Sequence, residues 1–226
     1  MPAQSPLPSH KSVATLKAKI LRPSLSSRFQ CWFQPPVSVA SWITAKSSNE
    51  GLGTNWDGEF VSLSCAEATL PGSTLTTHET TSDFSGVTER HAYRRQYDPT
   101  AQFSFYVDHD YNIIYFFEHW MSYIANEQYE DVLNPNFSYR VNFPNDYKAD
   151  GLYIRKFEKD YNHGNKTLQY KYINAYPISI NSMPVAYENS SILMCTVSFN
   201  YSRYVVMPTY RTSDNLGEDG LREWVA

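Results

Sequence analysis

No stretch of this sequence is long and apolar enough to form a membrane-spanning helix, which needs about 18 consecutive apolar residues. The most apolar stretch runs from Ile113 to Ile124, and Glu118 and His119 interrupt it. The amino-terminal segment also lacks the continuous apolar core of about 7–15 residues that marks a secretory signal. We therefore expect no membrane-spanning segment and no export.

Cysteine is scarce, with three residues at wide spacing, Cys31, Cys65 and Cys195. Each lies in an apolar alternating segment and not in a loop. This placement predicts buried, reduced thiols and no disulfide framework.

The common catalytic and phosphate-binding patterns are missing: there is no His-Glu-x-x-His, Gly-x-Ser-x-Gly, Gly-Lys-Ser/Thr loop or Cys-x-x-Cys. The best remaining group is Asp108-His109-Asp110 with Glu118 and His119, which could supply metal ligands or an acid–base pair. The same residues suit a helix cap and a solvated helix face, and we adopt that interpretation. We expect no enzyme, no metal and no cofactor, with a β-rich enzyme as an alternative.

Acidic residues are absent from the first 49 positions, which carry six lysines and arginines. This segment therefore has a formal charge of +6 and the rest of the chain −10, which gives the net charge of −4. Such a balance gives no overall positive field with which to hold nucleic acid. We expect the basic amino-terminal arm, residues 1–21, to be solvated or to contact a neighbouring subunit. Organelle targeting is the alternative for this acid-poor segment.

Aromatic residues make up 15% of the chain and charged residues 19%, which indicates a folded protein. Apolar and polar residues alternate with a period of two over most of the sequence, as in half-buried strands. The expected strands lie at Phe29–Phe33, Val61–Cys65, Phe103–Val107, Tyr139–Phe143, 152–157, 168–173, Ile178–Ile180 and Ile192–Val206. The strands at 152–157 and 168–173 are expected to form a hairpin, because Asn and Gly between them suit a tight turn.

One segment has helical spacing instead. Its apolar residues recur at intervals of three and four from Ile113 to Ile124, which predicts a helix over residues 112–126 lying on a sheet. Asp108 and Asp110 are expected to cap its start. The residues expected to pack this helix onto the sheet are Phe116, Phe117, Trp120 and Ile124.

These patterns predict one mainly β (α+β) domain over residues 22–206, an antiparallel β-barrel or sandwich with one flanking helix. Segments 34–59 and 130–166 are expected to be inserts, and residues 207–226 a carboxy-terminal tail. The 34–59 segment shows no periodicity, and the polar Gly72–Thr100 segment is expected to be a long loop.

The Gly72–Thr100 segment concentrates cations and aromatic rings: Arg90, His91, Tyr93, Arg94, Arg95 and Tyr97. Such a group can bind phosphate or stack on bases. In an acidic protein we favour a protein interface, where Arg and Tyr are also enriched. The chain's 18 tyrosines also suit surfaces that are covered on assembly.

The order of these elements resembles the tail tube proteins of contractile-tailed, T-even-like bacteriophages. Arg22-Pro23-Ser-Leu-Ser-Ser-Arg-Phe-Gln-Cys-Trp-Phe33 is similar to the family's first strand, and Leu63-Ser-Cys-Ala-Glu-Ala-Thr-Leu-Pro-Gly72 to its second. A strand then leads into the Trp-bearing helix between Phe103 and Ala125. The chain closes with Tyr172-Ile-Asn-Ala-Tyr-Pro-Ile178 and the strand that ends near Tyr204.

The resemblance implies a virion protein, made in the bacterial host cytoplasm, whose inner strands join in a six-membered ring. Rings would stack into the inner tube of a contractile tail, through which DNA passes without specific binding. The implied partners are other copies of the chain, the tail sheath, and baseplate or terminator proteins. An excess of acid facing the bore would keep it from holding phosphates.

The resemblance also implies roles for particular residues. The expected contacts to the adjacent ring are Thr76, Thr77, His78, Glu79, Arg90, Tyr93, Arg94 and Arg95. The expected sheet core and inter-subunit strands include Phe29, Cys31, Phe33, Leu193, Val197 and Phe199. The inserts and tails depart from a simple tube subunit, so a tube-initiating baseplate protein is one alternative, and a β-sandwich module that binds carbohydrate or another ligand is a second.

Overall fold

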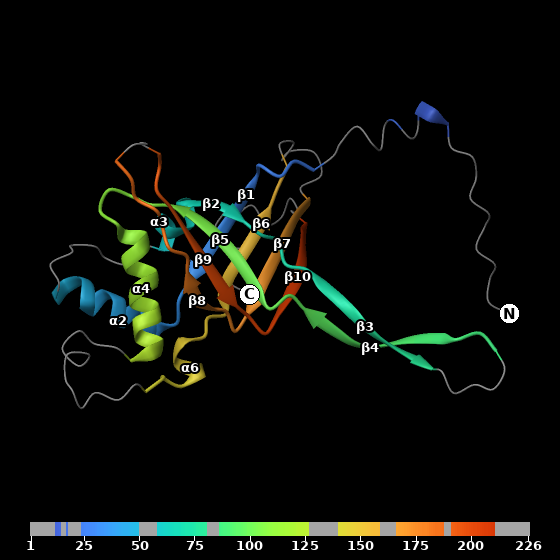
Figure 1. The fold of residues 1–226 in the computed structure, drawn as a ribbon. Helices are drawn as coiled ribbons and strands as arrows, with labels where there is room; N and C mark the ends of the chain where they lie inside the picture. Colours follow the sequence, from blue (N-terminus) through green and yellow to red (C-terminus); the bar gives the residue numbers. More distant parts are fainter. Residues whose placement is uncertain are drawn as a thin grey trace.

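The computed structural model describes residues 12–14, 17, 24–49, 58–80, 86–126, 140–158, 166–187 and 191–210. Within these residues the chain forms two four-stranded antiparallel sheets that pack face to face, helices at one end, and a two-stranded hairpin that projects from the other end (Figure 1). The protein is therefore mainly β with antiparallel sheets, as the alternation predicts. No helix in these residues is long and apolar enough to cross a membrane.

Sheet A has the order β1-β6-β7-β10 and sheet B the order β2-β5-β9-β8. The strands of sheet A are β1 (Phe29–Gln34), β6 (Gly151–Lys156), β7 (Lys166–Ile173) and β10 (Arg203–Tyr210). Those of sheet B are β2 (Cys65–Ala68), β5 (Thr100–Tyr106), β8 (Tyr176–Ile180) and β9 (Met194–Asn200). The helices are α2 (Val37–Asn49), α3 (Gly58–Leu63), α4 (Asn112–Ala125) and α6 (Pro144–Tyr147).

Aromatic rings from both sheets and from α4 form the core. Phe33 of sheet A lies 5.2 Å, between ring centroids, from both Phe103 and Phe105 of sheet B. Phe105 in turn lies 4.9 Å from Phe117 of α4. The indole N–H of Trp120 donates to the Tyr147 carbonyl at 3.2 Å, so the largest core ring leaves no unpaired donor. The helix therefore closes one end of the same core that holds the sheets together.

The helix α4 is confirmed, and its ends are satisfied in specific ways. Tyr111 adopts a left-handed conformation (φ 59°) before the first turn. Asp108 accepts hydrogen bonds from the Asn112 side chain at 2.6 Å and from the Ile113 N–H at 3.5 Å, as expected of a capping carboxylate. Asp110, the other expected cap, lies instead beside His109, with 3.7 Å between Oδ1 and Nδ1.

Two expected strands are wrong. Val61 and Leu63 lie in α3, where the Ser62 hydroxyl donates to the Gly58 carbonyl four residues earlier, and only Cys65 begins β2. Residues 140–143 form no strand, because the Asn142 side chain and N–H both donate to carbonyls at the end of α4. Tyr139 lies outside the described residues.

The expected final strand, Ile192–Val206, is two strands in two different sheets. β9 ends at Asn200, and β10 begins at Arg203 after a short connection in which the Ser202 N–H donates to the Ile173 carbonyl. Val197 and Phe199 lie in the core as expected, whereas Leu193 precedes β9 and is only half-buried. The alternation continues across the break, which is why the sequence pattern does not show it.

The segments expected to lack regular structure contain helices and strands. The 34–59 segment holds α2, whose Val39 and Ile43 are buried in the core. The Gly72–Thr100 segment forms the hairpin of β3 (Ser73–Thr80) and β4 (Glu89–Tyr97). The expected pairing of 152–157 with 168–173 is confirmed as β6 with β7, and their turn lies outside the described residues.

All three thiols are free, and Cys31 and Cys195 are buried while Cys65 is half-buried. Burial, with the nearby Glu118 carboxylate, raises the pKa of the Cys195 thiol to about 11. The hydrogen bond with Cys65 and, as a smaller cause, burial raise the pKa of the Cys31 thiol above its ordinary range. Both thiols therefore stay protonated near neutral pH, which makes them inert core residues.

We predict that Phe33→Ala lowers the free energy of unfolding by about 3–5 kcal/mol, because it leaves a cavity between the two sheets. The matched control is Phe143→Ala, whose ring is 80% exposed and should cost less than about 0.5 kcal/mol. Urea denaturation followed by tryptophan fluorescence measures both values. Equal costs for the two variants would contradict this description of the core.

Candidate assembly interface

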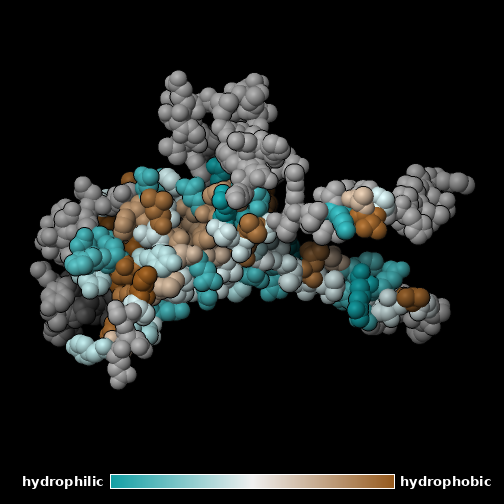
Figure 2. Space-filling model, turned by 90° about the horizontal axis from the view of Figure 1, so that it is seen from above, coloured by the Kyte–Doolittle hydropathy of each residue, from teal (hydrophilic) through white to brown (hydrophobic). Residues whose placement is uncertain are grey.

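The β3–β4 hairpin extends beyond the sandwich (Figure 1), and most of its residues on both faces are exposed. Every described residue from 86 to 96 is exposed, and Leu75 and Tyr93 are 64% and 67% exposed. Figure 2 shows hydrophilic side chains gathered on this projection, with isolated apolar residues among them. Two paired strands with no core of their own are marginally stable in water, so this hairpin suits a surface that is completed by a partner.

A shift in register between Thr76 and Thr77 sets which side chains share a face of the hairpin. On one face Arg90 forms an ion pair with Glu79, with 3.3 Å between Nε and Oε2. On the other face His78 and His91 stand directly opposite each other, and Arg94 lies opposite Thr76. The bulge therefore twists the outer half of the hairpin and distributes cations over both of its faces.

Arg95 joins the base of the hairpin to sheet A. Its guanidinium donates to the Ser73 hydroxyl at 2.9 Å and to the Tyr204 hydroxyl of β10 at 3.2 Å. The guanidinium carbon lies 5.0 Å from the Tyr97 ring centroid and 5.4 Å from that of Tyr204. We call Arg95, Ser73, Tyr97 and Tyr204 the hairpin clamp. It fixes the direction in which the hairpin leaves the domain, because a planar cation held by two rings and two hydroxyls has little freedom.

The residues expected to contact an adjacent ring are therefore all placed in the hairpin. Those of its outer part, His78, Glu79, Arg90, Tyr93 and Arg94, are exposed, and Thr76 is half-buried. Arg95 differs from them because its guanidinium bonds to Ser73 at the base of the hairpin and to Tyr204 of sheet A.

The residues expected to form the sheet core are mostly buried, as are three of the four expected to pack the helix. Cys31, Phe33, Val197 and Phe199 are buried, and Phe29 is half-buried. Phe116, Phe117 and Trp120 of α4 are buried and Ile124 is half-buried. These side chains hold the domain together, so a neighbouring subunit can reach only the outer margins of their strands.

Within the part of the chain that the structure describes, both sheets end in strands that have no paired neighbour on one side. In sheet B these margins are β2 and β8, and in the described part of the chain no backbone hydrogen bond extends from either of them to a further strand. Such margins present unpaired N–H and C=O groups that another chain can bind.

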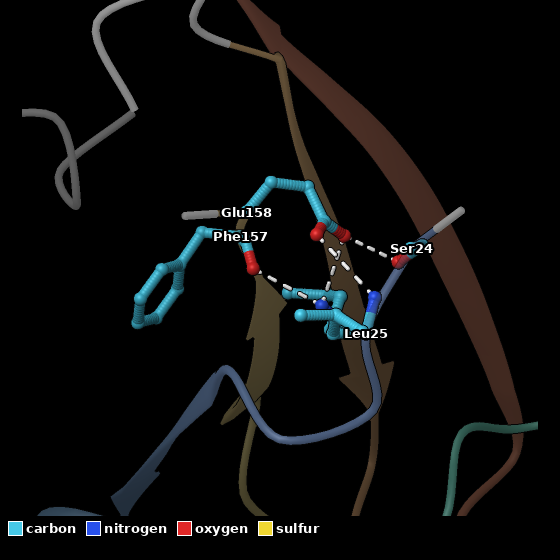
Figure 3. Close-up of polar contacts among 5 residues, drawn as sticks. Ser24, Leu25, Phe157 and Glu158 are labelled. Atoms are coloured by element: carbon cyan, nitrogen blue, oxygen red, sulfur yellow. Dashed lines mark hydrogen bonds and ion pairs between the residues drawn. The ribbon is translucent and has the colours of Figure 1, made fainter. Parts of the chain in front are cut away.

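A second anchor fixes the point where the amino-terminal segment joins the domain (Figure 3). The Glu158 carboxylate accepts hydrogen bonds from the Ser24 hydroxyl and, at 3.4 Å, from the Leu25 N–H. Lys156 lies 3.1 Å from the same carboxylate, from Nζ to Oε1. The Ser24 hydrogen bond, with help from Lys156, lowers the pKa of Glu158. The anchor's contribution is therefore present above the ordinary carboxyl range and is lost as pH falls through the lowered pKa.

The acid–base group considered from the sequence is not assembled into a site. His109 is fully exposed next to Asp110, and Asp108 is engaged at the start of α4. No three His, Cys, Asp or Glu side chains in the described ranges are placed to hold a metal ion.

Sequence reasoning missed the Tyr204 contact and the Glu158 anchor, because each joins residues more than 100 positions apart. The spacing of Arg95 and Tyr97 on one strand face was the available signal for a cation held by a ring. Nothing local indicated that Tyr204 would complete it.

We predict that Glu158→Ala lowers the protection of the Leu25 amide from hydrogen exchange at neutral pH, because its acceptor is lost. In the unmodified protein the same loss of protection should develop only as pH falls below the ordinary carboxyl range, since protonation removes the ion pair with Lys156. Glu67→Ala, at an exposed carboxylate outside the anchor, is the control. Unchanged Leu25 protection in Glu158→Ala would refute the anchor.

We predict that Arg95→Ala destabilises the hairpin base by about 1–2 kcal/mol, because three hydrogen bonds to two hydroxyls and two cation–π contacts are lost. Arg95→Lys should recover only part of this energy, since an ammonium lacks the planar fork. Amide exchange in peptides covering β3 and β4 measures the effect. Arg94→Ala, on the exposed face, should leave the exchange at the base unchanged, and an equal effect of Arg94→Ala and Arg95→Ala would argue against the clamp.

No curated protein sequence matches this chain significantly. Among solved structures, a chain of the anti-feeding prophage baseplate has a TM-score of 0.47 at 11% identity, covering 82% of this chain and 96% of that one. A chain of the anti-feeding prophage tube-terminating cap has a TM-score of 0.46 at 15% identity, covering 83% and 93%. A chain of the PVC sheath–tube complex, from an extracellular contractile injection system, has a TM-score of 0.46 at 12% identity, covering 88% and 100%.

The sequence model of one family matches most of the chain. Described as "phage tail tube protein", it covers residues 24–207, a range that begins at the Glu158 anchor and ends within β10. The hairpin, α4 and both sheets lie inside the matched range, except for the last three residues of β10. The chain therefore belongs to the phage tail tube protein family.

Proposed function

We propose that copies of this chain form six-membered rings that stack into the inner tube of a contractile phage tail, the conduit for the genome during delivery. The role is structural, without catalysis or cofactor. One observation carries this proposal. The chain is a folded domain of the tail tube family, and within its described residues the outer hairpin is exposed and the sheet margins are unpaired.

Strand direction supports closure of a ring through sheet B. All neighbouring strands of this sheet are antiparallel, so β2 and β8 at its two margins run in opposite directions. Rotation about an axis along the strands brings β8 of one copy beside β2 of the next in an antiparallel arrangement. Each copy then uses two different margins, which is the head-to-tail contact that generates closed rings. Closure also removes the open edges, which are otherwise sites of aggregation.

The hairpin supports stacking of rings. It extends away from the sandwich, and the hairpin clamp holds it in one direction. A projection that is rigid at its base and exposed along its length suits insertion into a neighbouring ring, where cations and Tyr93 would find partners.

The partners that follow from this role are the tail sheath around the tube and the baseplate or terminator proteins at its ends. Synthesis takes place in the host cytoplasm before assembly into the virion. A tube-initiating protein at the baseplate would use the same ring contacts but would stack in only one direction, so homogeneous tubes from the purified chain favour the repeating subunit.

We predict that the purified protein forms rings or tubes in negative-stain electron microscopy. A variant that replaces Thr77–Tyr93 by Asn-Gly joins Thr76 to Arg94, which are paired across the hairpin, and keeps the hairpin clamp. This variant should still form rings but should not stack into tubes. Circular dichroism checks that it is folded.

Monodisperse single subunits of the unmodified chain over the whole accessible concentration range would contradict the proposed assembly. Tubes of normal length from the shortened-hairpin variant would instead contradict the role of the hairpin in stacking.

A further inference from the structure

The two sheets present outward faces of opposite chemical character. On β5 and β9 the odd-numbered residues Phe103, Phe105, Val197 and Phe199 point into the core, so their even-numbered neighbours point away from it. We call these outward residues of sheet B, with Glu67 of β2, the neutral face. Its members on β2, β5 and β9 are Glu67, Thr100, Gln102, Ser104, Tyr106, Met194, Thr196, Ser198 and Asn200. On β8, Tyr176 and Ser179 are paired with Asn200 and Ser198 and belong to the same face.

The neutral face is made largely of small polar side chains without a cation. Its centre is the cross-strand pair Ser104 and Thr196, whose hydroxyl oxygens lie 3.0 Å apart and bond to each other. Ser198, the next outward residue along β9, is only 7% exposed. Glu67 is the one charged residue on this face in the described strands. Hydroxyls that bond to each other and a single carboxylate offer little to a phosphate backbone.

The outward face of sheet A is cationic and aromatic. Arg155 of β6, Lys171 of β7 and Arg203 of β10 lie on it, and the paired residues on this face include no acid. Lys171 lies 5.5 Å from the centroid of the neighbouring Tyr153 ring. Trp32 of β1 is paired with Tyr153 of β6. Cations beside aromatic rings are the combination that holds nucleic acid by phosphate neutralisation and base stacking.

We infer that the neutral face of sheet B lines the bore of the tube and that the cationic face of sheet A points away from it. A channel for DNA must let a polyanion move past many identical surfaces, and every cation on its wall would add an electrostatic contact. Only sheet B offers a wall without such contacts. The inference rests on the proposed tube, and it names the surface that the genome meets there.

This assignment replaces the expectation of a strongly acidic bore. The face that meets the DNA carries one carboxylate per subunit, Glu67, so it avoids binding mainly by lacking cations and unpaired donors. The −10 balance of the chain after residue 49 therefore resides mostly on other surfaces.

Two single cysteine variants with the same starting residue test the inference. Gln102→Cys lies on the neutral face and Gln30→Cys on the outward face of sheet A, and both glutamines are exposed in the free subunit. Assembled tubes and free subunits are each treated with a small maleimide and with a maleimide coupled to a globular protein too large for the bore. The unmodified chain measures the background from Cys65, the half-buried native thiol.

We expect both variants to react with both reagents as free subunits. In tubes, the rate of labelling of Gln102→Cys by the protein-sized reagent should fall on the order of tenfold or more, while Gln30→Cys changes by less than about twofold, because thiol labelling follows access. Labelling of Gln102→Cys in tubes at the rate found for free subunits would overturn the inference while leaving the tube itself intact. Failure of the unmodified chain to form tubes would count against the proposed function and, with it, this inference.

Discussion

The packing of one phenylalanine between two sheets is the interaction on which the rest of this structure depends. Phe33 of β1 contacts rings of β5 and β9, and those rings contact α4, so sheets and helix share a single aromatic core. Because the core is complete within the domain, the chain can fold before it meets a partner. Assembly can then use groups that folding leaves unsatisfied, which are the margins of the sheets and the hairpin.

The hairpin connects the folding of the domain to the proposed assembly of copies. Its base is held by Arg95 between Tyr97 and Tyr204, whereas its outer half has no contact with the core. The clamp therefore converts the rigidity of the sandwich into a fixed direction for an otherwise marginal pair of strands. The Glu158 anchor similarly holds Ser24 and Leu25, at the start of the matched family range.

The sequence was sufficient where one face of an element is apolar and the other polar. Alternation predicted β1, β5 and the β6–β7 pair, and helical spacing predicted α4 to within about one residue at each end. It failed where this contrast is absent. The hairpin is exposed on both faces, so no alternation distinguishes it from a loop. Among the described side chains of α2, Val39 and Ile43 are buried in the core, and the helix also carries four serines and one threonine. The break between β9 and β10 does not interrupt the alternation, so only tertiary pairing reveals it.

The proposed ring depends on pairing of the open margins of sheet B between copies. Hydrogen–deuterium exchange of assembled particles against free subunits tests it directly, in peptides covering β2 and β8, with β5 as the internal reference because both its sides are already paired. If the margins are paired, the backbone amides of β2 and β8 become protected on assembly while those of β5 change little. Assembled particles in which β2 and β8 exchange as fast as in the free subunit would contradict it.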